Sequence, residues 1–152
     1  MKLGAAGKTL IQSFEKLALV AYKDQGGVWT IGWGHTGPEA FEGATCSPAQ
    51  ADAWFDTDIR RAVNATNHSL DVALNQNQFD ALVAFTYNVG VGAEAHSALL
   101  RLVNGHHFDA AALEFGKWNH VAGQVSAGLT RRREAERELF VAPLPGAPAS
   151  GI

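Results

Sequence analysis

The sequence lacks the patterns that define several classes of protein. Cysteine occurs once among 152 residues, at Cys46, so the chain cannot form an internal disulfide and must fold through packing alone. No stretch approaches the roughly 20 apolar residues that a membrane-spanning helix needs. A net charge of −3 argues against a general surface for nucleic acid or an anionic membrane. The six histidines form no HExxH motif and cysteines are not paired, so no metal site and no cofactor are expected.

What the sequence does have is enough apolar material for one core. Hydrophobic residues make up 47% of the chain, and at this length one compact domain is expected, with room for two lobes around a cleft. The last ten residues, PLPGAPASGI, are rich in proline, glycine and alanine and carry no charged side chain. We therefore predict a folded domain over residues 1–142 and a flexible tail over residues 143–152.

Helix start signals dominate the folded part. Ser47 and Gln50 form a capping box with Pro48 at the first helical position, and Asn75 with Gln78 repeats the arrangement before the strongly apolar stretch FDALVAFTYNVG. The second signal opens a helix that we expect to be central. Apolar spacing and glycine breaks complete the set. Helices are predicted over residues 8–19, 47–64, from 75 onward, 97–104, 108–118 and 130–140.

Only one region has the pattern of a sheet. The segments VAYKD (20–24) and VWTIGWG (28–34) flank a Gln-Gly-Gly turn, which predicts a β-hairpin. Alternation along the second strand places Trp29 and Ile31 on one face and Thr30 on the other, beside Gly32 and Gly34. A hydroxyl next to two glycines leaves backbone open to a ligand. The alternative is a sheet trimmed by glycine so that a helix or loop can pack against it.

Two carboxylates near this hairpin are candidates for chemistry. Glu15 lies at the border of the apolar stripe of the first predicted helix. Partial burial disfavours a charged carboxylate, which is how a glutamate becomes a proton donor near neutral pH. Asp24 enters the glycine turn. The alternative interpretations are a solvated glutamate and an aspartate that binds the turn backbone.

The spacing of Glu15, Asp24 and Thr30 within FEKLALVAYKDQGGVWTIGWGHT resembles the phage-type lysozymes, the endolysins and muramidases of glycoside hydrolase family 24. The segments AFTYNVGVG (84–92) and KWNHVAGQVSAGLTRRREAERELF (117–140) extend the resemblance, which covers roughly residues 8–141. It implies a mostly helical α+β fold, with a small N-terminal β-hairpin lobe, a larger helical lobe and an active-site cleft between them.

The resemblance also implies an activity. Family members cleave the β-1,4 bond between N-acetylmuramic acid and N-acetylglucosamine in bacterial peptidoglycan. Glu15 would act as general acid, while Asp24 and Thr30 would position the attacking water, so the reaction would invert the anomeric configuration. Thr36, Tyr87 and Ser97 fall where family members line the cleft, and we expect them to bind substrate.

Three further expectations concern side chains outside this group. We expect His35 to orient the hairpin through a carboxylate such as Asp58 on the following helix. Glu94 stands where relatives often have an apolar residue, on the expected rim of the helical lobe. The arginines and glutamates of the last helix are expected to form a solvated face with ion pairs at helical spacing. They are Arg131, Arg132, Arg133, Glu134, Glu136 and Glu138.

Rival functions remain open at this level. A lytic transglycosylase would share the scaffold and Glu15 but needs no carboxylate to activate water, and a non-catalytic wall-binding relative would be expected to lose Glu15. A peptidase would need a zinc or cysteine constellation that the sequence lacks. The resemblance implies a monomer whose partner is the peptidoglycan glycan strand. It would pass from the host bacterial cytoplasm to the periplasm at lysis, through a holin or with an N-terminal signal-anchor segment.

Overall fold

The computed structural model describes residues 1–146. The N-terminal half holds α1 (Ala5–Phe14), β1 (Ala18–Lys23), β2 (Trp29–Gly32), α2 (Pro48–Ser69) and α3 (Gln76–Val89). The C-terminal half holds α4 (Val91–Ala95), α5 (Ala98–Asn104), α6 (Phe108–Glu114), the 3₁₀ helix η1 (Phe115–Lys117), β3 (His120–Val121), β4 (Gln124–Val125) and α7 (Ala127–Val141). Within residues 1–146, no helix combines the length and apolar character needed to cross a membrane.

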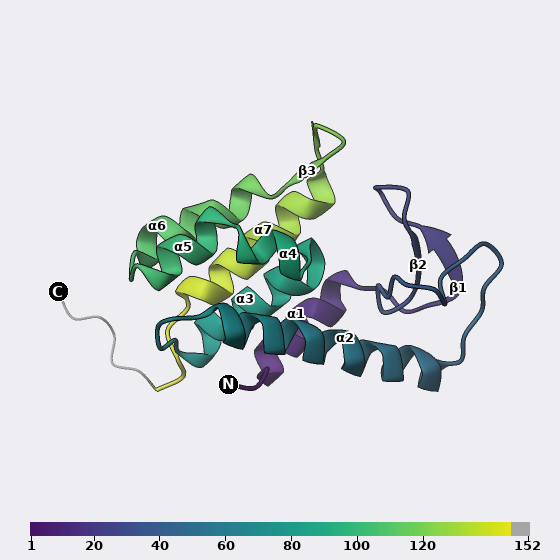
Figure 1. Cartoon of the computed structure of the whole chain (residues 1–152), viewed down its shortest axis with the longest axis horizontal. Helices are drawn as coiled ribbons and strands as arrows, with labels where there is room; N and C mark the ends of the chain where they lie inside the picture. The colour runs from purple at the N-terminus through teal and green to yellow at the C-terminus, as the bar shows by residue number, and fades with distance from the viewer. Residues whose placement is uncertain (147–152) are drawn as a thin grey trace.

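The chain folds into two lobes of unequal size. The β1–β2 hairpin forms the small lobe at one end of the molecule (Figure 1). The helices other than α2 form the larger lobe, and α2 runs from one lobe to the other. The predicted class, a mostly helical α+β fold with an N-terminal hairpin, is confirmed.

The small lobe is the hairpin predicted from the glycine turn. β1 and β2 pair antiparallel, with Tyr22 opposite Thr30 and Lys23 opposite Trp29. The pairing register shifts between Ala18 and Tyr22. A shift of this kind is typical of a β-bulge, which increases the local twist of a strand. β1 leads from the end of α1 to the turn that holds Asp24.

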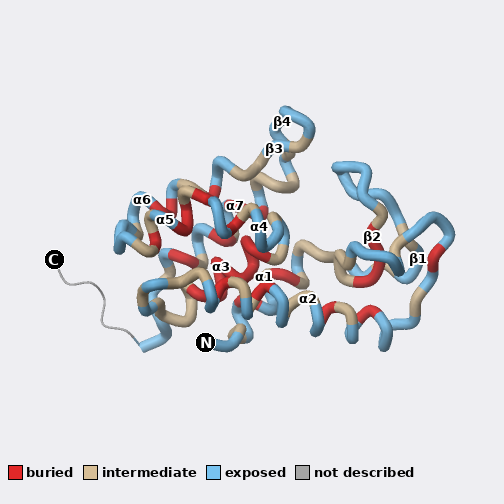
Figure 2. The backbone as a smooth tube through the Cα atoms, in the orientation of Figure 1, coloured by how far each residue is buried: buried red, intermediate tan, exposed pale blue. Residues whose placement is uncertain are grey.

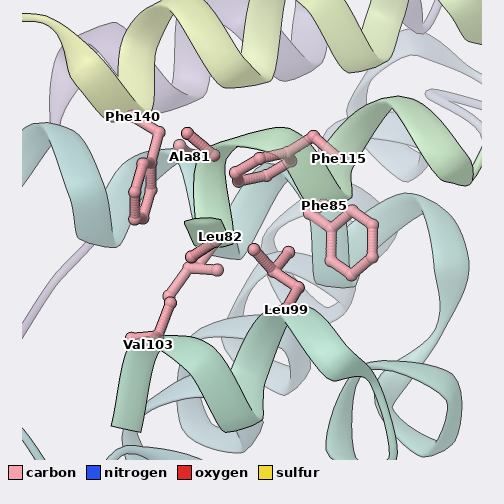
Figure 3. Packing of buried hydrophobic residues seen from close by; sticks show 9 residues of the cluster. Ala81, Leu82, Phe85, Leu99, Val103, Phe115 and Phe140 are labelled. Atoms are coloured by element: carbon pink, nitrogen blue, oxygen red, sulfur yellow. The ribbon is translucent and has the colours of Figure 1, made fainter. Parts of the chain in front are cut away.

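The large lobe is organised around α3, as its apolar sequence predicts. Residues 79–86 of this helix are all buried, and the buried segments in Figure 2 gather along it. One side packs on α5, α6, η1 and α7, where Leu82, Phe85, Leu99, Phe115 and Phe140 interlock (Figure 3). A second cluster joins α3 to α1 and α2. A helix that is apolar on all sides belongs in the core, and α3 links both halves of it.

Both predicted capping boxes are present. Ser47 accepts a hydrogen bond from the Gln50 amide at 3.1 Å, and the Gln50 side chain accepts one from the Ser47 amide at 2.9 Å. Asn75 and Gln78 make the same reciprocal pair. Such caps satisfy amides that a helix start leaves unpaired, so the first turns of α2 and α3 are fixed locally.

The prediction of a helix over residues 8–19 is wrong at both ends. α1 starts earlier because Asp80 of α3 replaces a local cap: its carboxylate oxygens accept from the amides of Gly4 at 2.8 Å and Gly7 at 3.1 Å. The helix ends at Phe14, and residues 18–23 pair with β2 instead. Strand pairing therefore overrides the helical spacing of Leu17 and Ala18.

Some elements differ from expectation or were missed. The predicted helix over 108–118 is split into α6 and η1, while the short helix α4 and the β3–β4 hairpin at Gly123 were not predicted. Residues 143–146 are exposed. The remainder of the predicted flexible tail, residues 147–152, lies outside the described residues.

Glu94 is not on a rim, as the sequence suggested, but fully buried in α4. The Ser69 hydroxyl donates to its Oε2 at 3.3 Å, and Oε1 has no hydrogen-bond partner within residues 1–146. Burial raises the pKa of Glu94, and the Ser69 hydrogen bond only partly opposes that shift. The ionised form is therefore disfavoured in the folded protein.

We predict that Glu94→Gln removes a pH-dependent loss of stability. A raised pKa means that the folded protein keeps a proton that the unfolded chain releases, so stability falls as pH rises from the ordinary glutamate value through the folded one. Urea unfolding from about pH 4 to about pH 8 should show the wild type losing stability relative to the variant. Glu42→Gln, at an exposed glutamate, is the control. Parallel pH profiles for wild type and Glu94→Gln would contradict the assignment.

Candidate active site

A cleft of about 920 Å³ lies between the two lobes. Its volume falls within the roughly 300–1,000 Å³ of typical ligand sites. The cleft is lined by the end of α1, the hairpin, the end of α3, the β3 segment and the start of α7. Five of the six residues predicted for the site line it: Glu15, Asp24, Thr30, Thr36 and Tyr87.

Glu15 sits at the junction of the lobes. It is the first residue after α1, with an extended backbone, and its amide still donates to the Ile11 carbonyl at 3.0 Å. Its side chain is only 15% exposed, and Oε1 accepts a hydrogen bond from Arg132 Nη1 at 2.7 Å. Glu15 is thus semi-buried, as expected, but by the helix end and an arginine instead of by a helical border.

Gly34 forms the seat of the other carboxylate oxygen. A Cβ at this position would lie 2.2 Å from Glu15 Oε2, and the backbone has φ +77°, which favours glycine. Gly32 serves a different contact, because a Cβ there would lie 3.2 Å from the Ala51 Cβ of α2. Neither glycine is simply open to a ligand. Gly34 makes room for the glutamate, and Gly32 makes room for a helix.

Asp24 is held by the turn that follows it. Its Oδ1 accepts hydrogen bonds from the amides of Gly26 and Val28, both at 2.9 Å. Oδ2 accepts none within residues 1–146, and the residue is exposed on the cleft wall. Asp24 therefore binds the turn backbone with one carboxylate oxygen and keeps the other without a partner in residues 1–146, on a residue that lines the cleft.

Thr30 is 4% exposed and lies on β2 facing the cleft. Its hydroxyl donates to the Val28 carbonyl at 2.9 Å. Because that bond uses the only proton of the hydroxyl, Oγ1 is left as an acceptor for a molecule in the cleft.

Tyr87 and Thr36 line the cleft where a second, smaller hollow of about 330 Å³ adjoins it. The Tyr87 hydroxyl donates to the Trp33 carbonyl at 2.6 Å, joining α3 to the hairpin segment. Ser97 is the exception among the predicted residues. It is 3% exposed, does not line the cleft, and caps α5 by accepting from the Leu100 amide at 3.1 Å.

His35 fixes the segment after β2 to α2, as expected. Its Nδ1 lies 2.7 Å from Asp58 Oδ2 and its Nε2 lies 2.9 Å from Glu39 Oε2, while the ring stacks on Trp54. Burial lowers the pKa of His35, but the hydrogen bonds to the two carboxylates together outweigh this effect, so the net shift of the pKa is upward. His35 therefore holds in place the backbone of Gly34, the preceding residue.

The prediction that the charged residues of α7 form a solvated face is wrong for three of the six. Arg132, Arg133 and Glu136 are buried, whereas Arg131, Glu134 and Glu138 are not. Helical spacing indicated that these charges could pair, but the partner of Arg132 in the cleft is Glu15, which is 117 residues away in the chain. Sequence reasoning also missed Asn88, which lines the cleft and accepts a hydrogen bond from Arg133.

Comparison with known proteins agrees with this geometry. The phage lysozyme family model matches residues 12–136, which include all five predicted residues that line the cleft. The chain belongs to the phage lysozyme family. It is 43% identical over 143 residues to the endolysin of Bacillus phage B103, a match that covers 93% of this chain and 54% of that protein. This chain thus spans little more than half the length of that relative.

Solved structures show the same fold. The muramidase domain of SpmX from Asticaccaulis excentricus is 42% identical, with a TM-score of 0.82 over 93% of this chain and 99% of that one. A P22 lysozyme mutant is 34% identical, with a TM-score of 0.75 over the same shares of the two chains.

We predict that Gly34→Ala destabilises the protein more than an alanine substitution at another glycine where the added methyl causes backbone strain but no clash. The added methyl would push Glu15 away from Arg132, and the buried arginine would lose the carboxylate to which it donates at 2.7 Å. Gly43→Ala is the matched control, since Gly43 has φ +82° and a Cβ there would meet nothing within 4 Å. Urea unfolding should show an additional loss of about 1–3 kcal/mol for Gly34→Ala. Equal losses for both variants would contradict the proposed seat.

Proposed function

We propose that this chain is a muramidase that hydrolyses the β-1,4 bond between N-acetylmuramic acid and N-acetylglucosamine in bacterial peptidoglycan. The observation that carries the proposal is the arrangement of Glu15 and Asp24 in one cleft. One carboxyl is semi-buried at the lobe junction, and the other lies in an exposed turn. Two carboxyls in different environments are what acid-assisted glycoside hydrolysis requires.

Glu15 acts as the general acid. Because Arg132 donates to Oε1, the proton to be transferred is carried on Oε2, the oxygen beside Gly34. Transfer of this proton to the glycosidic oxygen lets the C–O bond break as positive charge develops at the anomeric carbon. Arg132 keeps the carboxyl in one orientation and leaves Glu15 ionised, as its partner, after the proton has gone.

Asp24 and Thr30 position and activate the attacking water. The free Oδ2 of Asp24 accepts a proton from the attacking water, and Thr30 Oγ1 accepts a hydrogen bond from its other hydrogen. Water that is held in this way attacks the anomeric carbon from the face opposite the leaving group. The reaction is therefore inverting, and the Glu15 and Asp24 carboxyls should be separated by about 6.5–9.5 Å to leave room for the water.

A lytic transglycosylase remains the alternative on the same scaffold. It would yield anhydro-ended products instead of hydrolysed ends, and it would have no use for the water site at Asp24 and Thr30. A non-catalytic wall-binding role is disfavoured by the presence of Glu15 in the cleft. The fixed acid, together with a free carboxylate oxygen, supports hydrolysis.

We predict that Glu15→Gln folds and loses activity. The amide cannot transfer a proton to the leaving oxygen, and general acid catalysis typically contributes roughly 10²- to 10⁴-fold. Clearing of outer-membrane-permeabilised bacteria should fall by at least about 100-fold while circular dichroism remains native. Glu42→Gln, at an exposed glutamate, serves as the control. A folded variant that clears cells faster than this limit would exclude Glu15 as the acid.

The stereochemistry gives an independent prediction for Asp24. Proton NMR of a soluble β-linked glycan, recorded before mutarotation, should show the α-anomer as the first product. First release of the β-anomer, or a glycosyl ester trapped on Asp24, would make Asp24 a nucleophile instead of a base.

The biological setting follows from the same proposal. The partner is the glycan strand of peptidoglycan, approached by a monomer without cofactor or metal, and the site of action is the periplasm at host cell lysis. Export from the bacterial cytoplasm would use a holin or a signal-anchor segment.

A further inference from the structure

Three charged side chains of α7 are buried beneath the cleft. Arg132 is 4% exposed, and Arg133 and Glu136 are fully buried. Taking charges out of water costs several kcal/mol per ion unless each charge finds a partner. Their contacts therefore decide whether this cluster serves the site or only the fold.

Glu136 divides its two oxygens between the two arginines. Its Oε1 lies 3.4 Å from Arg132 Nε, and its Oε2 lies 3.2 Å from Arg133 Nε. Each guanidinium also lies over an aromatic ring, Arg132 over Phe14 and Arg133 over Phe85. Each guanidinium is thus held by an ion pair with Glu136, which forms no hydrogen bond within residues 1–146, and by an aromatic ring on one face.

The far ends of the two arginines reach different groups of the cleft. Arg132 Nη1 donates to Glu15 Oε1 at 2.7 Å, and Arg133 Nη2 donates to Asn88 Oδ1. Glu15 and Asn88 both line the cleft. One buried carboxylate therefore lies behind two residues that face the substrate space.

The contact with Arg133 determines what Asn88 offers. A guanidinium has only donors, so the atom of Asn88 that it binds must be the oxygen. The amide nitrogen donates no hydrogen bond to any other part of residues 1–146, so it is left without a protein partner on a residue that lines the cleft. An amide N–H₂ in a sugar-binding cleft suits a carbonyl oxygen, such as that of an acetamido group.

We propose that Glu136 is a positioning residue of the cleft, which fixes Glu15 through Arg132 and, through Arg133, turns the amide N–H groups of Asn88 toward an acetamido carbonyl of the glycan. This inference rests on the proposed glycosidase function and adds a substrate contact to it. A purely structural role would make Glu136→Gln less stable, because two buried arginines lose a partner, but it would not change the kcat and KM of the folded variant.

The experiment measures kcat and KM on soluble peptidoglycan oligosaccharides for Glu136→Gln, Asn88→Ala and the double variant. Burial raises the pKa of Glu136 to about 7, against the opposing effect of the two arginines, so assays are run at about pH 8, where Glu136 is ionised. Glu138→Gln, at an exposed glutamate on the same helix, is the matched control.

Glu136→Gln should lower kcat about 10-fold or more, because misplacement of a catalytic group by about 1 Å can cost 10²-fold. It should also raise KM. Asn88→Ala should raise KM with little change in kcat. Since Glu136 acts on Asn88 through Arg133, the double variant should have a KM no more than about twice that of Glu136→Gln. The control should match the wild type.

Two results would overturn the proposal while the wild type remains active: a folded Glu136→Gln with unchanged kcat and KM, or KM effects that multiply in the double variant. If Glu136→Gln does not fold, Asn88→Asp decides the matter, because a carboxylate can still accept from Arg133 but offers no N–H group. Its KM should rise as in Asn88→Ala, and a wild-type KM would reject the proposal. An inactive wild type would instead reject the proposed function.

Discussion

The ion pair between Glu15 and Arg132 is the contact on which the rest of the site depends. It joins the end of α1, where the chain enters the small lobe, to α7, which packs against the central helix α3. Both side chains are largely buried, and loss of a buried hydrogen-bonded partner costs about 1–3 kcal/mol. The orientation of the candidate acid is therefore a consequence of how the two lobes meet.

Several features of the fold become intelligible from this contact. The residue after α1 must be extended so that Glu15 can reach the cleft, and the hairpin segment must approach with no side chain at Gly34. His35 ties that segment to α2, and the Tyr87 hydroxyl ties it to α3. These contacts come from the core elements, so the small lobe is placed by the same helices that form the core of the large one.

The sequence was sufficient wherever structure is determined by neighbouring residues. The hairpin around Gly26 and Gly27, both capping boxes and the apolar α3 all depend on local patterns, and they were predicted correctly. The resemblance added the group of Glu15, Asp24 and Thr30, which the structure brings into one cleft.

The errors arise where a distant partner decides. Asp80 caps α1 from α3, strand pairing ends α1 at Phe14, and burial against the rest of the fold turns Arg132 and Glu136 from surface charges into an internal cluster. Such contacts span much of the chain, and no periodicity within α7 distinguishes them from a solvated face. Ser97 was misplaced for a related reason, because a serine that caps a buried helix has the same local sequence as one that lines a cleft.

The most direct test of the account is a crystal structure of Glu15→Gln with a bound peptidoglycan tetrasaccharide. The account predicts that the scissile glycosidic oxygen lies within hydrogen-bond reach, about 2.6–3.2 Å, of the amide at position 15. It also predicts a water molecule held between Asp24 and Thr30 on the opposite face of the sugar. A glycan bound outside this cleft, or an Asp24 carboxylate in direct contact with the anomeric carbon and no space for water, would contradict it.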